Sequence, residues 1–132
     1  MKTNIGLWIN HEKAVIVMVT GNKDETQTIT SEIEKHRRQS GIETPADDRQ
    51  QSEVAEHLNR YYDKVISEVK HANSLFIFGP GEAKGEFKKR LENRGYNSTI
   101  IAVLPADHMT DPQIVAKVRV RFVPADAAWH IG

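Results

Sequence analysis

The chain has 132 residues, of which 39% are hydrophobic and 27% charged, an ordinary balance for a single soluble domain. It has no cysteine, which excludes disulfides and thiolate metal sites, and no apolar run reaches the roughly 18 residues of a membrane helix. Basic and acidic residues number 18 each, so any attraction to nucleic acid must come from a local patch. We therefore expect a cytoplasmic protein without a membrane segment, whose near-neutral charge permits self-association.

The first quarter of the chain has the pattern of an antiparallel meander. Strand-like stretches lie at residues 4–9, 14–19 and 26–33. In the first stretch, Ile5, Leu7 and Ile9 share one face, whereas Trp8 lies on the other, where it could pack under a helix or form an interface. The second stretch is continuously apolar, as is typical of a strand covered on both faces.

Residues 34–51 break this pattern with the polar sequence EKHRRQSGIETPADDRQQ. A polar segment this long inside a compact domain is usually functional or mobile, and we expect a mobile loop within one domain spanning residues 1–132. Its basic side chains are candidates for contact with RNA phosphates. These candidates are Lys35, Arg37, Arg38 and Arg49. The alternative is plain solvated charge, because Asp47 and Asp48 share the segment.

The remainder of the chain alternates between helix and strand. Residues 52–71 have a broad apolar face with helical spacing, and Ser52 suits the N-cap. A strand, a helix, a strand and a helix should follow, at residues 74–78, 82–94, 98–104 and 110–122. The order βββ-α-β-α-β-α predicts an α/β fold with a mixed sheet, parallel later strands and helices on both faces.

The last of these segments has two competing patterns. Val118, Val120 and Phe122 alternate as in a strand. However, Thr110-Asp111-Pro112-Gln113 is a strong helix start, with a capping residue, proline in the first turn and a glutamine that can reach back. We therefore expect a helix.

The Gly-Pro-Gly turn after residues 74–78 has features of an anion site. Ligands of open α/β sheets bind at the carboxyl edge of the strands, and free N–H groups at a helix start favour an anion. Gly79, Gly81 and Lys84 are the candidates in this turn. Asp107, His108 and Asp111 follow the next parallel strand and are candidates for a polar pocket at the same edge.

A purely structural interpretation of both loops stays open. Pro80 lacks an N–H, and Glu82 places a negative charge at the helix start. The spacing also fits no nucleotide-binding motif. The glycines can simply form a tight turn, and Thr110 or Asp111 can simply cap the last helix.

The stretch LFIFGPGEAKGEFKKRL resembles the strand–turn–helix in the central domain of archaeal and eukaryotic peptide-chain release factors and their Pelota relatives. The residues at matching places are Gly79, Pro80, Gly81, Lys84 and Phe87. The resemblance implies a ribonuclease-H-like fold and a translation-related role on the ribosome or a structured RNA. The chain also resembles the small bacterial stand-alone relatives of this domain.

One departure from the release-factor pattern limits the expected chemistry. In release factors the loop before the long helix carries Gly-Gly-Gln, whereas residues 34–51 contain Arg37-Arg38-Gln39-Ser40-Gly41 and no such motif. Peptidyl-tRNA hydrolysis is therefore not expected. Pelota-type proteins also lack Gly-Gly-Gln and act in ribosome rescue, so a ribosomal role stays open. We expect no catalytic residue, cofactor or metal, since the first strand lacks the carboxylate of ribonuclease-H-like nucleases.

Three hypotheses follow from the sequence. The preferred one is a non-catalytic, translation-related binding module that contacts the ribosome or RNA through the basic loop. The second is a small protein or enzyme that binds a phosphate ligand at the turn Gly79–Gly81. The third is a self-assembling interaction protein, a homo-oligomer that uses an exposed strand edge or Trp129.

Overall fold

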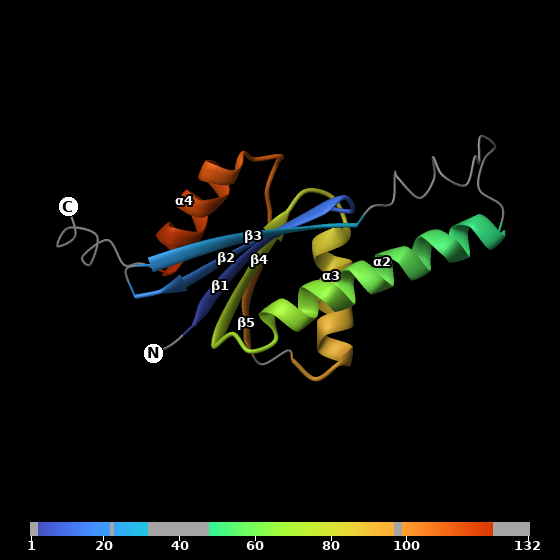
Figure 1. Cartoon of the computed structure of the whole chain (residues 1–132), viewed down its shortest axis with the longest axis horizontal. Coiled ribbons are helices and arrows are strands. Elements are labelled where there is room, and N and C mark those ends of the chain that lie inside the picture. The colour runs from blue at the N-terminus through green and yellow to red at the C-terminus, as the bar shows by residue number, and fades with distance from the viewer. Residues whose placement is uncertain (1–2, 22, 32–47, 97–98, 123–132) are drawn as a thin grey trace.

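The computed structural model describes residues 3–21, 23–31, 48–96 and 99–122, and for residues 48–53 the backbone alone. The elements follow the predicted order. They are β1 (Asn4–Ile9), β2 (Lys13–Thr20), β3 (Lys23–Thr30), α2 (Asp48–Val69), β4 (Ser74–Gly79), α3 (Ala83–Asn93), β5 (Ile100–Pro105) and α4 (Asp111–Phe122). The strands form one mixed sheet in the order β3-β2-β1-β4-β5, so the predicted ribonuclease-H-like α/β fold is confirmed (Figure 1).

Strand β1 occupies the centre of the sheet and sets the direction of its neighbours. It pairs antiparallel with β2, placing Leu7 opposite Ile16, and parallel with β4, placing Leu7 opposite Ile77. Strand β3 continues the antiparallel part and β5 the parallel part. The carboxyl ends of β1, β4 and β5 therefore lie at the same edge of the sheet.

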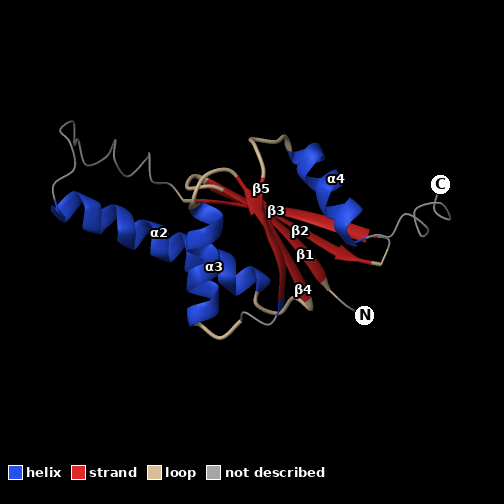
Figure 2. Cartoon of the chain, turned by 180° about the vertical axis from the view of Figure 1, so that it is seen from behind, coloured by secondary structure: helices blue, strands red, loops and turns tan. Residues whose placement is uncertain are grey.

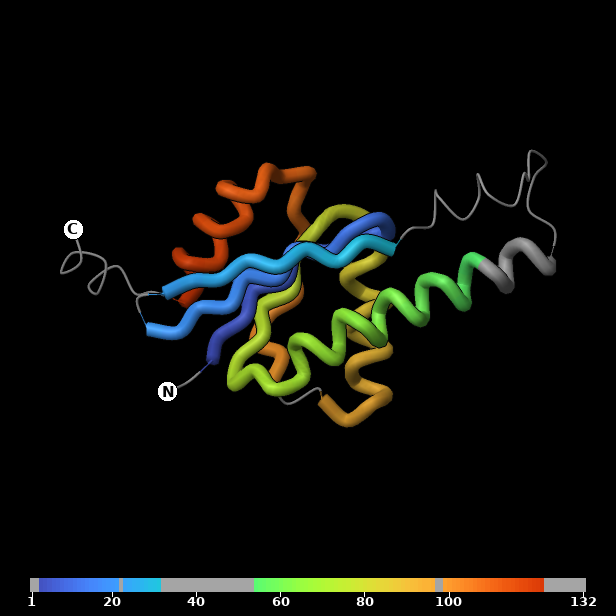
Figure 3. Tube along the Cα trace, in the orientation of Figure 1, coloured from blue at the N-terminus to red at the C-terminus, as the bar shows by residue number. Residues whose placement is uncertain are grey.

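Helices cover both faces of the sheet, as predicted. Helices α2 and α3 lie on one face and α4 lies on the other (Figures 2 and 3). The alternation in β1 divides its side chains between two cores. Ile5, Leu7 and Ile9 pack toward α2 and α3, whereas Trp8, only 1% exposed, packs with Ile114 of α4. Trp8 thus anchors the second helical layer.

The start of α2 corrects one predicted boundary. The helix begins at Asp48, so Ser52 lies inside it and residues 48–51 belong to the helix instead of the predicted loop. Arginine and glutamine are good helix formers, and an aspartate at the first position suits the helix dipole, which explains the earlier start. The rest of the predicted loop, residues 34–47, lies outside the described residues.

Gly95 ends α3. This glycine follows the C-cap with φ of 87°. Its N–H donates to the Glu92 carbonyl at 2.9 Å, and the Tyr96 N–H donates to the Leu91 carbonyl at 3.2 Å. These are the two hydrogen bonds of a Schellman motif, which satisfies carbonyls at a helix end.

Residues 111–122 are helical, which resolves the conflict between the two patterns. The Thr110 N–H donates to the Gln113 side-chain oxygen at 2.9 Å, and the Gln113 N–H reaches the Thr110 hydroxyl at 3.4 Å, so a capping box forms. Val118 is fully buried whereas Val120 is 82% exposed. A strand would have placed both residues on one face.

The two edges of the sheet differ in how they are protected from pairing. Strand β3 opens with Lys23, Asp24 and Glu25, and charge of this kind blunts an edge. Strand β5 carries no charged residue and exposes Ile101 and Leu104.

The predicted self-assembly stays a prediction, and Trp129 lies outside the described residues. None of the helices in the described ranges is long and apolar enough to cross a membrane.

Candidate functional site

The Gly-Pro-Gly turn joins β4 to α3 at the carboxyl edge of the sheet. Gly79 has φ of 151°, and a Cβ atom there would overlap the carbonyl oxygen of Ile9 at the end of β1. Gly81 has φ of 65° in open space. The first glycine therefore permits close approach of two strands, and the second permits the reversal of the chain.

The contacts within this turn favour its interpretation as a tight turn. The Lys84 ammonium donates a hydrogen bond to the carbonyl oxygen of Gly81. Glu82 forms the N-cap of α3 and makes no capping hydrogen bond with its side chain. Lys84 thus already serves the backbone of the turn, and anion binding at Gly79 and Gly81 stays a prediction.

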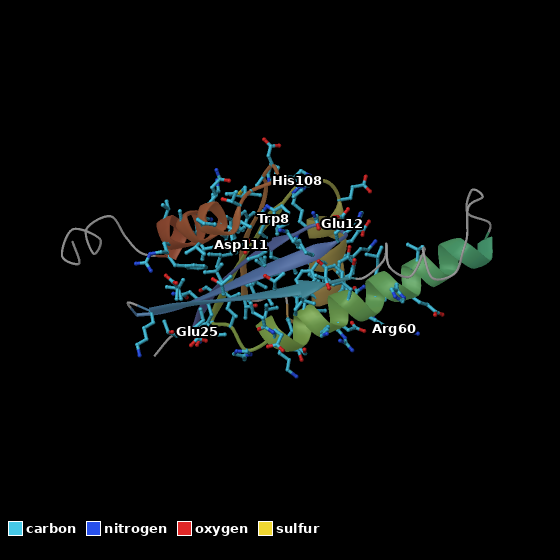
Figure 4. All side chains as sticks on the ribbon, turned by 45° about the horizontal axis from the view of Figure 1, so that its top comes forward. Trp8, Glu12, Glu25, Arg60, His108 and Asp111 are labelled. Carbon is cyan, nitrogen blue, oxygen red and sulfur yellow. The ribbon has the colours of Figure 1, made fainter. Side chains whose placement is uncertain are left out.

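The second predicted loop, after β5, lies beside the first. The Ala106 N–H donates to the Gly79 carbonyl at 3.0 Å, and the Trp8 indole N–H donates to the Asp107 carbonyl at 3.2 Å. The Trp8 and His108 rings lie 6.1 Å apart, at the end of the sheet where α4 begins (Figure 4). The side chains of Asp107, His108 and Asp111 are exposed, and a polar pocket there stays a prediction.

A groove of about 460 Å³ lies between α2 and α3, away from the predicted site. Its walls combine charged, amide and apolar side chains. They are Ala55, Leu58, Asn59, Tyr62, Glu86, Lys89, Arg90, Asn93 and Arg94. Sequence reasoning missed this groove because it requires two helix faces, distant in sequence, to meet.

One carboxylate organises the basic wall of the groove. Asp63 accepts two hydrogen bonds from Arg90, from Nε at 2.6 Å and from Nη2 at 2.9 Å. Nη1 of Arg94 donates to the same carboxylate at 3.2 Å. Hydrogen bonding to Arg90 holds the pKa of Asp63 below its usual value. Two guanidinium groups share one carboxylate, so positive charge remains.

The acid that lines the groove, Glu86, is held by a buried tyrosine of α2. The Tyr62 hydroxyl donates to Oε1 of Glu86 at 2.7 Å, and His11 Nε2 lies 3.0 Å from the same oxygen. Burial, followed by the Glu86 hydrogen bond, raises the pKa of Tyr62, so its hydroxyl remains a donor. The Tyr61 hydroxyl donates to the Asn10 carbonyl at 3.0 Å, which ties α2 to the β1–β2 turn.

Replacing Asp63 with asparagine is expected to lower the free energy of unfolding by about 0.5–1 kcal/mol at neutral pH. The value is small because solvent screens the pair: the Asp63 side chain is 35% exposed and that of Arg90 is 32% exposed. Since the folded pKa is depressed, the stabilisation is present above the unfolded pKa of about 3.9 and disappears as pH falls through the folded value.

Urea unfolding of both proteins at neutral pH and at about pH 2 measures this effect. The difference between Asp63→Asn and the unmodified chain should close in acid. Glu92→Gln, an exposed acid on α3, supplies the matched control and should change stability little at either pH. A difference that persists unchanged in acid would contradict the assignment to the ion pair.

The predicted RNA-contact residues remain untested by the structure. Lys35, Arg37 and Arg38 lie outside the described residues, and Arg49 is described only by its backbone in α2. Within the described residues, no group of histidine, aspartate and glutamate side chains is arranged to hold a metal ion.

No protein-family model matches the chain, and no curated protein matches it. Among solved structures, the Pelota protein of Thermoplasma acidophilum is 23% identical over 97% of this chain and 34% of that chain, with a TM-score of 0.61. The archaeal translation termination factor aRF1 is 12% identical over 98% of this chain and 37% of that chain, with a TM-score of 0.61. Archaeoglobus fulgidus Pelota is 13% identical over 98% of this chain, with a TM-score of 0.59.

These likenesses confirm the resemblance to the release-factor and Pelota fold that the Gly-Pro-Gly stretch suggested. Identities of 12–23% show a shared fold and nothing finer. The chain spans about a third of the length of these structures, 34–37% of each.

Proposed function

We propose that this chain is a non-catalytic, translation-related binding module that contacts the ribosome or a structured RNA through basic residues of segment 34–51. The supporting observation is the fold shared with Pelota and with a translation termination factor, over 97–98% of this chain. The chain spans only about a third of the length of those proteins, and we therefore propose binding alone and none of their wider activity.

The chemistry of the segment suits phosphate contact. Lys35, Arg37, Arg38 and Arg49 supply cations in a chain whose net charge is zero, so binding should be local and sensitive to salt. The segment has no Gly-Gly-Gln sequence, and the proposal therefore includes no hydrolysis of peptidyl-tRNA. Such a module would act in the cytoplasm.

The proposal predicts that the protein co-sediments with ribosomes at low salt and dissociates as salt rises. Reversing two charges, Arg37→Glu with Arg38→Glu, should lower the ribosome-bound fraction about tenfold, because phosphate contacts are replaced by repulsion. Sedimentation through a sucrose cushion, followed by quantitative immunoblotting, measures this fraction.

A control variant separates local contact from overall charge. Lys70→Glu with Lys117→Glu makes the same change in net charge at two exposed positions outside the segment, and it should co-sediment nearly as well as the unmodified chain. Ribosome contact is contradicted if the unmodified protein remains above the cushion, unbound to ribosomes, at low salt. The proposal also fails if the control variant loses as much binding as the arginine variant.

A further inference from the structure

We propose that the groove between α2 and α3 binds phosphate groups of an RNA backbone, as a second contact site distinct from segment 34–51. The inference rests on the proposed function for its choice of RNA, but it uses different residues, all of them described by the structure. The groove shares no lining residue with the Gly-Pro-Gly turn or with segment 34–51.

The charges lining the groove favour an anion. Lys89, Arg90 and Arg94 line it together with one acid, Glu86, and the Asp63 carboxylate that holds the arginines is a second, so three cations face two acids. Glu86 is already engaged, because its Oε1 accepts the hydrogen bond of Tyr62 and lies beside His11. Within the described residues, no ion pair joins Lys89 to a carboxylate. An incoming anion therefore meets cations whose charge is not fully balanced.

Asp63 leaves the arginines available for a ligand. It holds Arg90 by Nε and Nη2, which fixes the guanidinium plane, and it holds Arg94 by Nη1 alone. Among the described residues, no hydrogen-bond acceptor takes up Nη1 of Arg90 or the other nitrogens of the Arg94 guanidinium. The Arg94 side chain is 48% exposed, so these donors are accessible. One fixed guanidinium beside one accessible guanidinium suits the oxygens of a phosphate.

The shape of the groove favours a polymer over a small molecule. Small-molecule sites usually enclose most of the ligand surface. Here each wall includes exposed side chains, among them Asn59 of α2, Asn93 of α3 and Arg94 at its C-cap. An open channel with cations along one wall and amide groups on both suits a strand that passes through. Arginine pairs with carboxylates and phosphates alike, so the choice of RNA over an acidic peptide rests on the proposed function, and competition with polyglutamate separates the two.

The test is fluorescence anisotropy of the full chain with a labelled oligouridylate of about 12 nucleotides. Lys89→Gln with Arg94→Gln should weaken binding about tenfold and reduce the slope of log affinity against log salt by about 1.4, from two lost phosphate contacts. The Asp63–Arg90 pair is left intact and only the exposed Arg94–Asp63 contact is lost, so circular dichroism melting should change little. Lys70→Gln with Lys117→Gln, the matched control, should leave both affinity and slope unchanged.

Competition experiments identify the ligand. Unlabelled oligouridylate should displace the probe at lower phosphate concentration than uridine monophosphate or inorganic phosphate. If uridine monophosphate competes as well as oligouridylate at equal phosphate concentration, the groove binds free phosphate groups and the assignment to RNA is overturned. Polyglutamate of equal length that competes as well as the RNA would overturn it too. Absence of RNA binding by the unmodified chain, or equal weakening in the control, would overturn the site itself.

A titration followed by amide NMR places the ligand. Oligouridylate should shift the amides of Asn59, Lys89 and Asn93, and shifts confined to Gly81 and Lys84 would overturn the groove in favour of the turn. The two proposals fail separately. Loss of ribosome binding in Arg37→Glu/Arg38→Glu, with no effect of Lys89→Gln/Arg94→Gln on RNA affinity, would reject the groove alone. The reverse result would reject the basic segment and retain the groove.

Discussion

Replacing Gly79 with alanine is expected to lower the free energy of unfolding by about 3 kcal/mol or more. Two costs combine at this position. The φ of 151° is rarely adopted by a residue with a side chain, and the added methyl group would overlap the Ile9 carbonyl oxygen. Neither partner can rotate away, because the obstruction is backbone. Relief requires β1 and β4 to separate at their carboxyl ends, which also strains the hydrogen bond from Ala106 to Gly79.

Gly81→Ala is the matched control for this change. Gly81 also has positive φ, 65°, but a methyl group there meets nothing within 4 Å. Its cost should be the left-handed conformation alone, about 1 kcal/mol. Urea unfolding of both variants measures the difference, and faster hydrogen exchange at the Ala106 amide in Gly79→Ala would locate the damage. Equal losses in the two variants would contradict the steric account.

Glycine has two structural uses, and this is why Gly79 and Gly81 suggest a phosphate site in the sequence. Glycine is required both where backbone approaches an anion and where backbone approaches another strand. The sequence places Gly79 at the end of a strand, but the neighbour that it must admit, Ile9, is 70 positions away. The structural use of Gly79 therefore does not depend on a ligand. A phosphate site needs its own evidence, such as uncommitted donors, and Lys84 is already committed to Gly81.

The fold was largely predictable because its signals are local. Alternation in residues 4–9 separates Trp8 from Ile5, Leu7 and Ile9, and the structure places them in two cores. The capping box at Thr110 and the glycine at position 95 also act within one turn of a helix. The start of α2 was missed because a helix can begin among polar residues without any apolar periodicity.

The groove was not predictable from local patterns. Arg90 and Arg94 are four residues apart, so they share a helix face, and this spacing was an available signal. Their partner Asp63 lies on another helix, 27 and 31 positions away along the chain. Only the packing of α2 against α3 makes one carboxylate serve both guanidiniums. The predicted RNA-contact residues, by contrast, follow only from the basic side chains gathered in the polar segment 34–51.

The second core depends on the absence of a side chain at Gly6, which faces α4. A Cβ atom at this position would overlap Cγ2 of Val118 and lie 2.6 Å from its Cγ1. Gly6→Ala is therefore expected to lower the free energy of unfolding by about 2 kcal/mol, by pushing α4 away from the sheet. Val118→Ala alone should cost a similar amount, about 2 kcal/mol, because it leaves a cavity over β1.

The double variant should lose less stability than the two single variants together, by about 1 kcal/mol or more. Truncating Val118 removes both atoms that lie closest to the new methyl group, leaving the Val118 Cβ at 2.9 Å, and that methyl group partly fills the cavity.

Gly85→Ala supplies the control cycle, since a methyl group there meets nothing within 4 Å, and its effect on stability should add independently to that of Val118→Ala. Urea unfolding of all variants gives both coupling energies. If the stability losses of Gly6→Ala and Val118→Ala simply add, α4 does not pack on β1 through this contact. Because α4 and the groove lie on opposite faces of the sheet, the double variant should also retain the RNA affinity of the unmodified chain, which separates a loss of core packing from a loss of binding.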